Sequence, residues 1–271
     1  SLAEPLDGLR PALARVRDDD LDVGLVVDDG GEVGEVQSGF NQMVDGVRER
    51  RQIQDLFGRH VGQAVATQAL ERGTGLRGEQ ADASVVSVDI VGSTAMAEVL
   101  APDEVVDTLN DFFDVVVRVV DGQGGWVNKF EGDGALCIFG VPGTQPDHAD
   151  RALRAARLLS LALADLAERH LGLAAGIGVS SGRVVAGNVG TEARYEYTVI
   201  GPAVNEAARL TEVAKGRAVK VLASGETVRR AAGEASRWHD VGTVALRGRT
   251  APTAIHEPLV DEPAAAPSEP R

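Results

Sequence analysis

Hydrophobic residues recur at regular spacing along most of the chain, and the spacing divides it into two parts of different character. Before residue 79 the apolar positions follow three- and four-residue steps, which is the period of amphipathic helices. Between residues 79 and 259, helical stretches alternate with short apolar runs bounded by glycine, which are typical of strands. The pattern predicts a helical N-terminal part followed by an α/β domain.

The first 51 residues hold two amphipathic patterns joined by an acidic connector. The first pattern opens at Pro5, the second opens at Glu32, and the connector spans residues 17–31. Two such helices cannot bury both apolar stripes by themselves, so we expect a parallel dimeric four-helix bundle. The pattern alone also allows a generic amphipathic helix pair. Residues 52–78 continue the helical spacing as a linker that ends in a glycine-rich stretch.

The domain predicted at 79–259 is built from short strands and longer helices. Strands are expected over 84–89, 126–130, 135–139, 173–179, 183–186, 195–200, 219–222, 224–232, 238–246 and 253–259. Helices are expected over 94–100, 103–121, 147–171 and 202–214. The last residues, 260–271, are rich in Pro, Ala and Glu and predict a disordered tail.

Composition and charge narrow the class of protein. Hydrophobic residues make up 44% and charged residues 25% of the 271 positions, as in ordinary globular proteins. A formal net charge of −14 argues against a nucleic-acid partner, which would require a basic face. The single cysteine, Cys137, excludes an internal disulfide and is expected in the core, and the five histidines show no zinc-site spacing.

The start of the sequence and the lengths of its apolar runs bear on whether a longer protein contains it. No apolar run reaches the ~18–20 residues of a membrane-spanning helix. The sequence begins Ser-Leu-Ala rather than with Met. We therefore expect a fragment of a longer protein whose N-terminal segment is missing.

The stretch Gly124–Gly140 is the strongest candidate for chemistry. Its two strands are joined by a tight Glu-Gly-Asp-Gly turn, in which glycine accepts the positive φ that a close turn needs. Asp133 lies in this turn, and Lys129 lies in the otherwise apolar strand before it. A second acid, Asp89, ends another apolar strand. Two carboxylates that each close a buried strand suit a divalent cation such as Mg²⁺.

Two further patterns suit a phosphate-bearing substrate. Gly92, Ser93 and Thr94 follow Asp89 and open a helix, where free backbone N–H groups bind phosphate. Asn205 and Arg209 stand four residues apart in a helical segment, so they share one helix face. Taken alone, the first pattern is a weak signal because such strand-to-helix turns are common, and the second is more typical of a solvated polar stripe.

Three motifs in this order, VDIVGST, NKFEGDGALCIFG and YTVIGPAVNEAARL, resemble the catalytic domain of class III nucleotidyl (adenylyl) cyclases. The resemblance covers about residues 83–259 and implies an α/β fold, the ferredoxin-like α+β sandwich of the cyclases. Residues 1–51 resemble a HAMP signalling module, in which helix, extended connector and helix follow one another.

The resemblance assigns roles to individual residues. It implies that Asp89, Asp133 and the carbonyl of Ile90 hold two Mg²⁺ or Mn²⁺ ions in each site. Asn205 would orient the ribose and Arg209 would neutralise charge on the α-phosphate, a task that suits a permanently charged guanidinium. Gly92, Ser93 and Thr94 would contact phosphate, Arg247 the triphosphate, and Lys129 with Thr198 the purine.

Three positions depart from the family pattern. Thr198 stands where many adenylyl cyclases have Asp, and its hydroxyl can both accept and donate a hydrogen bond, so it discriminates less sharply. Arg247 replaces a lysine, and Pro202 replaces an aspartate at the first turn of a helix, where proline fits.

The resemblance implies a homodimeric adenylyl cyclase that converts ATP to 3′,5′-cyclic AMP and pyrophosphate. Each site would lie between two subunits, one supplying the metal-binding acids and the other the purine-binding and transition-state residues. The HAMP module would regulate activity, and the parent protein would be anchored at the inner face of the membrane. The alternatives are a guanylyl cyclase, which usually carries an acid in place of Lys129, and a catalytically idle signal relay. A diguanylate cyclase is disfavoured because its Gly-Gly-acid-acid-Phe turn is absent from the sequence.

Overall fold

The computed structural model describes residues 8–27, 31–61, 78–170, 172–191 and 194–259. The chain divides into two compact units, Ser1–Ala66 and Thr67–Arg271, which are described separately. The disordered tail expected at 260–271 and most of the linker expected at 52–78 lie outside the described residues.

The first unit contains two helices joined by an extended connector, as the periodicity predicts. Helix α2 spans Leu9–Arg17 and helix α3 spans Glu32–Val61. Side chains from both helices and the connector form a small core of Ala12, Val23, Phe40 and Val44. The connector is fixed to α3 because Asn41 accepts from the Leu25 N–H and donates to the Leu25 carbonyl, each at 2.8 Å.

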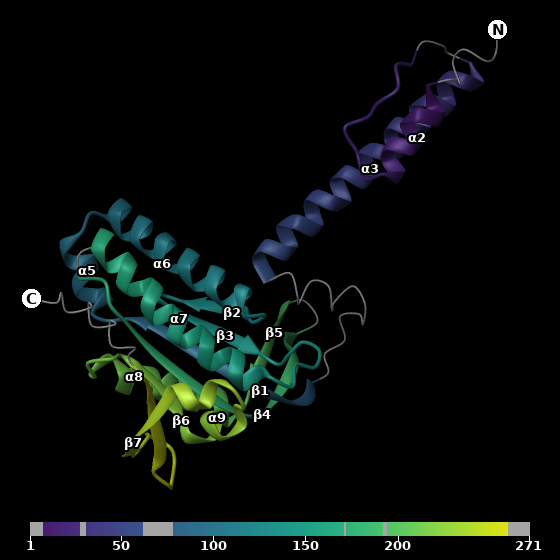
Figure 1. Ribbon diagram of the computed structural model, residues 1–271. Coiled ribbons are helices and arrows are strands. Elements are labelled where there is room, and N and C mark those ends of the chain that lie inside the picture. Colours follow the sequence, from purple (N-terminus) through teal and green to yellow (C-terminus); the bar gives the residue numbers. More distant parts are fainter. Residues whose placement is uncertain (1–7, 28–30, 62–77, 171, 192–193, 260–271) are drawn as a thin grey trace, which may run out of the picture. The chain divides into compact units, whose positions relative to one another are not determined.

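The second unit is built on one eight-stranded sheet in the order β2-β3-β1-β4-β6-β8-β7, with β5 paired to the far half of β4 (Figure 1). The strands are β1 (Gly78–Ile90), β2 (Trp126–Glu131), β3 (Gly134–Phe139), β4 (Ala175–Thr191), β5 (Arg194–Ile200), β6 (Val221–Ser224), β7 (Trp238–Val244) and β8 (Thr253–Pro258). The helices are α5 (Ser93–Val99), α6 (Pro102–Gly122), α7 (His148–Arg169), α8 (Pro202–Lys215) and α9 (Gly225–Arg230), with the short 3₁₀ helix η1 (Glu234–Arg237).

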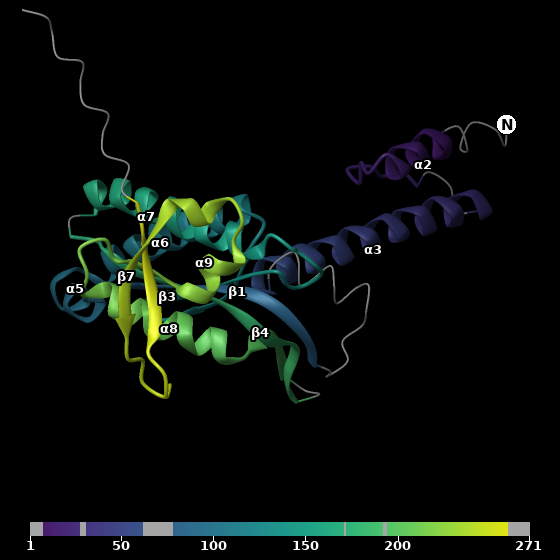
Figure 2. The same cartoon turned by 60° about the horizontal axis from the view of Figure 1, so that its bottom comes forward.

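The first four strands define the fold class. They follow the chain order β1-helices-β2-β3-α7-β4, while neighbours in the sheet follow the order β2-β3-β1-β4 and all pair antiparallel. This is the ferredoxin-like arrangement, so the predicted fold class is confirmed. Helices α6 and α7 cover one face of the sheet and α8 covers the other (Figure 2). The main core lies under α6 and α7 and includes Cys137, whose side chain is buried as expected.

Strand β4 differs from the sequence prediction. The Ser180-Ser181-Gly182 stretch was expected to form a turn between two strands, but it lies within one continuous strand. Ser180 donates to the buried carboxylate of Glu206 at 2.7 Å, and the Ser181 hydroxyl lies 2.5 Å from that of Ser84. Because both serine side chains are satisfied by partners on neighbouring elements, they have no need of the local bonds that turns provide.

The segment 224–232 is the second difference, since the predicted strand is helix α9. The Oγ atom of Ser224 accepts from the backbone N–H of Thr227 at 3.3 Å, which caps the first turn. Glu226 then pairs with Arg229 and Arg230, three and four residues later. These local bonds favour a helix, so the prediction of a strand at 224–232 was wrong.

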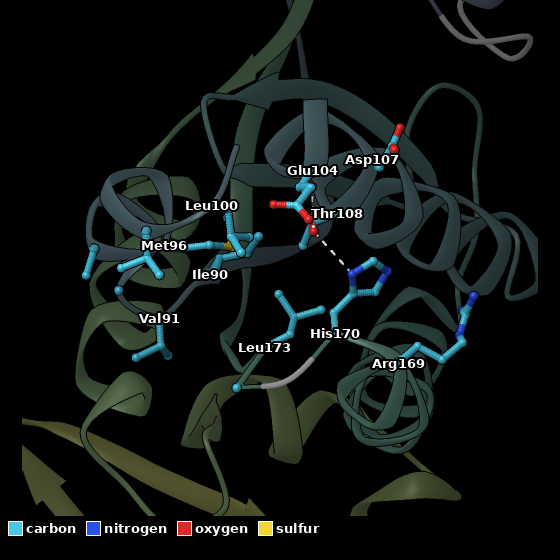
Figure 3. Close-up of a pocket in the computed structure, with 14 residues that line it drawn as sticks. Ile90, Val91, Met96, Leu100, Glu104, Asp107, Thr108, Arg169, His170 and Leu173 are labelled. Atoms are coloured by element: carbon cyan, nitrogen blue, oxygen red, sulfur yellow. Dashed lines mark hydrogen bonds between the residues drawn. The ribbon is translucent and has the colours of Figure 1, made fainter. Parts of the chain in front are cut away.

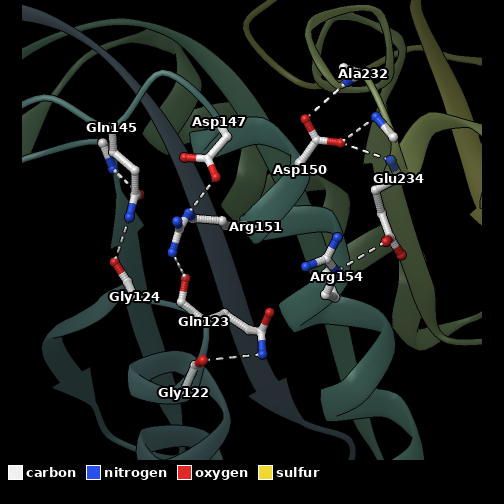
Figure 4. A network of polar contacts seen from close by, with 12 residues as sticks. Gly122, Gln123, Gly124, Gln145, Asp147, Asp150, Arg151, Arg154, Ala232 and Glu234 are labelled. Atoms are coloured by element: carbon white, nitrogen blue, oxygen red, sulfur yellow. Dashed lines mark hydrogen bonds and ion pairs between the residues drawn. The ribbon is translucent and has the colours of Figure 1, made fainter.

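A polar network joins the start of α7 to the segment before β7 (Figure 4). The carboxylate of Asp150 accepts from the backbone N–H groups of Ala232, Gly233 and Glu234 at 2.7–2.9 Å. Burial opposes ionisation of Asp150, but the three donors together hold its pKa below the ordinary value. The network fixes the segment before β7 to helix α7.

Asp150→Ala is expected to lower the free energy of unfolding by about 2 kcal/mol at pH 7, the scale of hydrogen bonds to a charged group. Because the folded pKa of Asp150 is depressed, its contribution is present above the unfolded pKa and is lost as the pH falls through the folded pKa. Urea unfolding at several pH values should therefore show the difference shrinking in acid. Asp147→Ala, which removes only an exposed pair with Arg151, is the matched control and should change stability by less than about 1 kcal/mol.

Candidate active site

The structure brings Asp89 and Asp133 together. Asp89 is opposite Gly134 in the β1–β3 register, which places it beside the β2–β3 turn that contains Asp133. The backbone N–H of Ile90 donates to the Asp133 carbonyl at 3.3 Å and fixes the turn against the end of β1. Burial raises the pKa of Asp89, and the neighbouring charge of Asp133 raises it further. The two acids therefore lie close together, at the place where the sequence analysis expects a metal site.

Gly134 leaves the space that the Asp89 carboxylate occupies. A Cβ atom at position 134 would lie 2.6 Å from Oδ1 of Asp89 and 2.9 Å from the Val88 carbonyl oxygen. Two carboxylates with an adjacent backbone carbonyl offer the hard oxygen ligands that Mg²⁺ and Mn²⁺ take. Across the described ranges, this site included, no three or more His, Cys, Asp or Glu side chains are grouped for a metal, so the site offers two acids. The donor set therefore fits a divalent ion that keeps coordination positions open for substrate.

Lys215, the last residue of α8, pairs with the Asp89 carboxylate and also lies 3.0 Å from Glu212. Burial opposes the charged ammonium, but its two carboxylate partners raise the pKa of Lys215 above the ordinary value. Lys215 thus supplies a positive charge at Asp89, at a position where a bound cation would also neutralise the acid.

Lys215→Met is expected to tighten the binding of Mn²⁺ alone by roughly tenfold, because an incoming ion no longer has to displace an ammonium from Asp89. Isothermal titration of the metal without nucleotide measures the effect. Arg118→Met removes a charge from the exposed face of α6 and is the control, with no expected change. Equal affinities for the wild type and Lys215→Met would contradict the assignment.

Asn205 and Arg209 lie on one exposed face of α8, as their spacing predicted. In the described part of the chain, neither side chain has a hydrogen-bond or ion-pair partner. Arg209 is six residues from Lys215, or about 9 Å along the helix axis, and points in a different direction around it. Within one chain, Asp89 therefore pairs with Lys215 of α8 and not with Arg209 of the same helix.

The predicted purine-binding residues lie on β2 and β5. The Lys129 ammonium is 2.7 Å from Glu131 and also senses the charge of Glu196; its pKa is raised, chiefly by the Glu131 contact. Thr198, two residues after Glu196 and half-buried, donates its hydroxyl proton to Oδ1 of Asn128 at 2.8 Å. Lys129 and Thr198 are therefore neighbours through Asn128.

The phosphate-contact residues predicted after Asp89 lie at the start of α5. Gly92 adopts a left-handed conformation with φ of 69°, and Ser93 and Thr94 form the first turn of this seven-residue helix. Behind this loop is a cavity of about 620 Å³ (Figure 3). Apolar side chains of α5 line one part of it, and the polar side chains that α6 contributes, Glu104, Asp107 and Thr108, line another together with His170. Neither Asp89 nor Asp133 lines the cavity, although Ile90 and Gly92, which follow Asp89, do.

Arg247 lies in the exposed connection between β7 and β8. Arg249, two residues later, contacts the carboxylate of Glu206 at 2.5 Å. Glu206 is only 7% exposed and also accepts from Ser180 and Thr253. This connection is therefore anchored to α8 through Arg249, while Arg247 is left at the surface.

Three residues of this region were missed in the sequence. Asn128 precedes Lys129 directly, Glu206 follows Asn205 directly, and Lys215 ends the helix that carries Arg209. An acid within a run of small apolar residues, as in Asn-Glu-Ala-Ala, is a signal that could have identified Glu206 as a buried anchor. The partners of Asn128 and Lys215 are 70 and 126 residues away, and no local pattern reveals them.

Comparison with known proteins identifies the family. Residues 77–256 match the family model described as the adenylate and guanylate cyclase catalytic domain. The chain therefore belongs to the adenylate and guanylate cyclase catalytic domain family. It is 49% identical over 259 residues to the uncharacterized protein Rv1318c of Mycobacterium tuberculosis, covering 95% of this chain and 47% of the relative. The chain thus spans about half the length of the curated relatives it matches.

Solved structures agree on the family but differ in substrate. The guanylyl cyclase Cya2 is 33% identical with a TM-score of 0.60, covering 69% of this chain and 97% of that one. The adenylyl cyclase CyaB from P. aeruginosa is 28% identical with a TM-score of 0.61, covering 70% and 98%. The chain is a nucleotidyl cyclase domain, in a family that generally uses divalent metals. Among the residues the structure describes, no helix is long and apolar enough to cross a membrane.

Proposed function

We propose that the protein is an adenylyl cyclase that converts ATP to 3′,5′-cyclic AMP and pyrophosphate. The ribose 3′-oxygen forms a bond to the α-phosphorus while the bond to the pyrophosphate oxygen breaks. No covalent enzyme intermediate is needed, so positioning and electrostatics supply the rate. The observation that carries the proposal is the convergence of Asp89 and Asp133 beside Gly134.

Asp89, Asp133 and the carbonyl of Ile90 would hold two Mg²⁺ or Mn²⁺ ions. When bound, such ions lower the pKa of an attacking hydroxyl and neutralise phosphate charge. Asn205 orients the ribose, and Arg209 stabilises the charge that grows on the α-phosphate. The backbone and side chains of Gly92, Ser93 and Thr94, with Arg247, contact the phosphates.

A homodimer completes the site in this proposal. One protomer supplies the acids, and its partner supplies the Asn205–Arg209 face together with the purine-binding residues. The separation of Arg209 from Lys215 along α8 supports this division. So do Val185, Val189 and Ile200, which lie on one face of the β4–β5 pair and are each at least 43% exposed. An exposed apolar row on a projecting strand pair suits contact with a second copy.

Adenine is the proposed base because Lys129 donates to N1 of adenine, which is an acceptor, whereas N1 of guanine carries a hydrogen. A guanylyl cyclase is the second candidate, favoured by the 33% identity to Cya2. The two are separated by the residues that contact the purine, because the remaining chemistry is common to both.

The N-terminal unit is proposed to be a HAMP module that dimerises and controls the catalytic domains. Its two helices leave Leu13, Val36, Met43 and Val47 between 39% and 49% exposed although they are apolar. A second copy of the same helix pair would cover them in a four-helix bundle. We place the parent protein at the inner face of the membrane, anchored by a segment N-terminal to this chain. An idle relay of the same fold is the alternative from another class.

The direct test is to incubate the chain with Mn²⁺ and either ATP or GTP over a range of protein concentration. Cyclic AMP from ATP, with specific activity that rises as the protein dimerises, is the expected result. Cyclic GMP in excess would establish the guanylyl alternative. Absence of both products from a folded dimer would favour the relay.

A further inference from the structure

Asn128 joins strand β2 to strand β5 through its side-chain amide. Its Nδ2 donates to the backbone carbonyl of Tyr197 at 2.8 Å, and its Oδ1 lies 2.8 Å from Oγ1 of Thr198. The side chain is half-buried, as is that of Thr198. One amide therefore contacts both the backbone and the side chain of the strand that carries a predicted purine-binding residue.

The orientation of this amide follows from its partners. The Tyr197 carbonyl has no hydrogen, so only the NH₂ end of Asn128 can face it. The oxygen of the amide is then left facing Thr198, and this oxygen can only accept. The single hydroxyl hydrogen of Thr198 must therefore point at Asn128, leaving only lone pairs for another partner.

We propose that Asn128 is a positioning residue that sets the base specificity by making the Thr198 hydroxyl an acceptor only. An acceptor at this place favours the 6-amino group of adenine and disfavours the 6-oxo group of guanine. A freely rotating threonine would satisfy either base. The inference rests on the proposed function, since it assumes that Lys129 and Thr198 face the purine.

The strand geometry explains how Asn128 comes to lie beside Lys129. The β2–β3 register shifts between Val127 and Lys129, so Asn128 is the extra residue of a bulge. Val127 packs against the core under α6, and Phe130 contacts Phe113 of α6 with ring centroids 4.3 Å apart. The intervening Lys129 is opposite Leu136 on the other face of the sheet. Bulges re-aim side chains in this way beside active sites.

The two purine contacts are then complementary. The Lys129 ammonium can only donate, and the Thr198 hydroxyl held by Asn128 can only accept. In adenine, N1 is an acceptor and can meet the Lys129 ammonium, and the 6-amino group is a donor and can meet the Thr198 hydroxyl. Guanine offers the reverse at both positions, so Asn128 gives the threonine the selectivity that a carboxylate would have there.

A double-mutant cycle tests the proposal on the full 271-residue chain. The variants are Asn128→Ala, Thr198→Val and the two combined, and the measured quantity is kcat/KM for ATP divided by kcat/KM for GTP. Asn128→Ala is expected to lower this ratio roughly tenfold, because the freed hydroxyl can donate to guanine. In the Thr198→Val background the same change should leave the ratio unaltered, because no hydroxyl remains to be oriented.

Asn110→Ala, an exposed asparagine on α6, is the matched control and should leave the ratio unchanged. Asn128→Ser is a second variant, to be used if the Asn128→Ala chain fails to fold. Its side chain is too short to hold the Thr198 hydroxyl, so it should lower the ratio of ATP to GTP kcat/KM as Asn128→Ala would. An unchanged ratio in folded variants overturns the proposal. So does an equal change with and without the Thr198 hydroxyl, which would mark a merely structural role.

The same double-mutant cycle can be measured by binding alone, as the ratio of the dissociation constants for 3′-deoxy-ATP and 3′-deoxy-GTP in each variant. Both analogues lack the attacking hydroxyl, so neither is turned over. A chain that makes no cyclic AMP but shows the cycle in these constants would refute the proposed function and support the role of Asn128. A chain that makes cyclic AMP, but whose ratio of ATP to GTP kcat/KM does not change on substitution of Asn128, would support the proposed function and refute the role of Asn128.

Discussion

An equal mixture of Asp89→Ala and Arg209→Ala chains is expected to regain about one quarter of wild-type activity, although each variant alone is expected to lose at least roughly a hundredfold. In a dimer with shared sites, each mixed dimer holds one site with both halves intact and one site with both halves damaged. Random pairing makes half of the dimers mixed, so one site in four is competent. Cyclic AMP formation with Mn²⁺, measured after the chains have exchanged partners, gives the result.

Two further mixtures serve as controls. Asp89→Ala with Asp133→Ala damages the same half of the site in both chains, and so does Asn205→Ala with Arg209→Ala. Neither mixture should recover activity. If Asp89→Ala and Arg209→Ala also fail to complement while folded and dimeric, the two residues act from one chain and the shared site is wrong.

Gly134→Ala is expected to lower kcat/KM by roughly a hundredfold, the scale for displacing a reacting group by about 1 Å. The added Cβ would lie 2.6 Å from the Asp89 carboxylate and 2.9 Å from the Val88 carbonyl oxygen, so the acid must move. Titration with Mn²⁺ alone should show weaker binding, because the two carboxylates no longer converge.

Gly122→Ala is the control for this substitution. It adds the same methyl group at the last residue of α6, where nothing lies within 4 Å of the new atom. Activity and metal affinity should stay at wild-type values. A fully active Gly134→Ala chain would show that Asp89 does not need its present position.

Much of the fold could be predicted because apolar spacing and local signals agree in most elements. Pro202 at the first turn of α8 and Gly132, whose φ of 65° suits the turn before Asp133, each favour the observed element by a local mechanism. The continuous strand at Ser180–Gly182 could not be predicted, because its stability comes from partners on α8 and β1. Helix α9 was missed although Ser224 and Glu226 carry a capping and charge-pair signal.

Some residues of the candidate site could likewise be identified from the sequence, and others could not. Its acids were identifiable because each ends an apolar strand, and the structure brings them to one place. The role of Asn128 could not be predicted, since it depends on a bulge and on a carbonyl 69 residues away. Lys215 likewise reaches Asp89 only because α8 packs across β1 and β4, with the Thr211 hydroxyl donating to the Ser87 carbonyl at 2.9 Å.

The buried carboxylate of Glu206 also limits how α8 can move. It sits between Asn205 and Arg209 in sequence but faces inward, where Ser180, Arg249 and Thr253 hold it from separate elements. A twist of the helix about its own axis would break all of these bonds together. The orientation of the Asn205–Arg209 face is thus locked to the body of its own protomer, and switching is expected to come from rigid displacement of one whole protomer against the other.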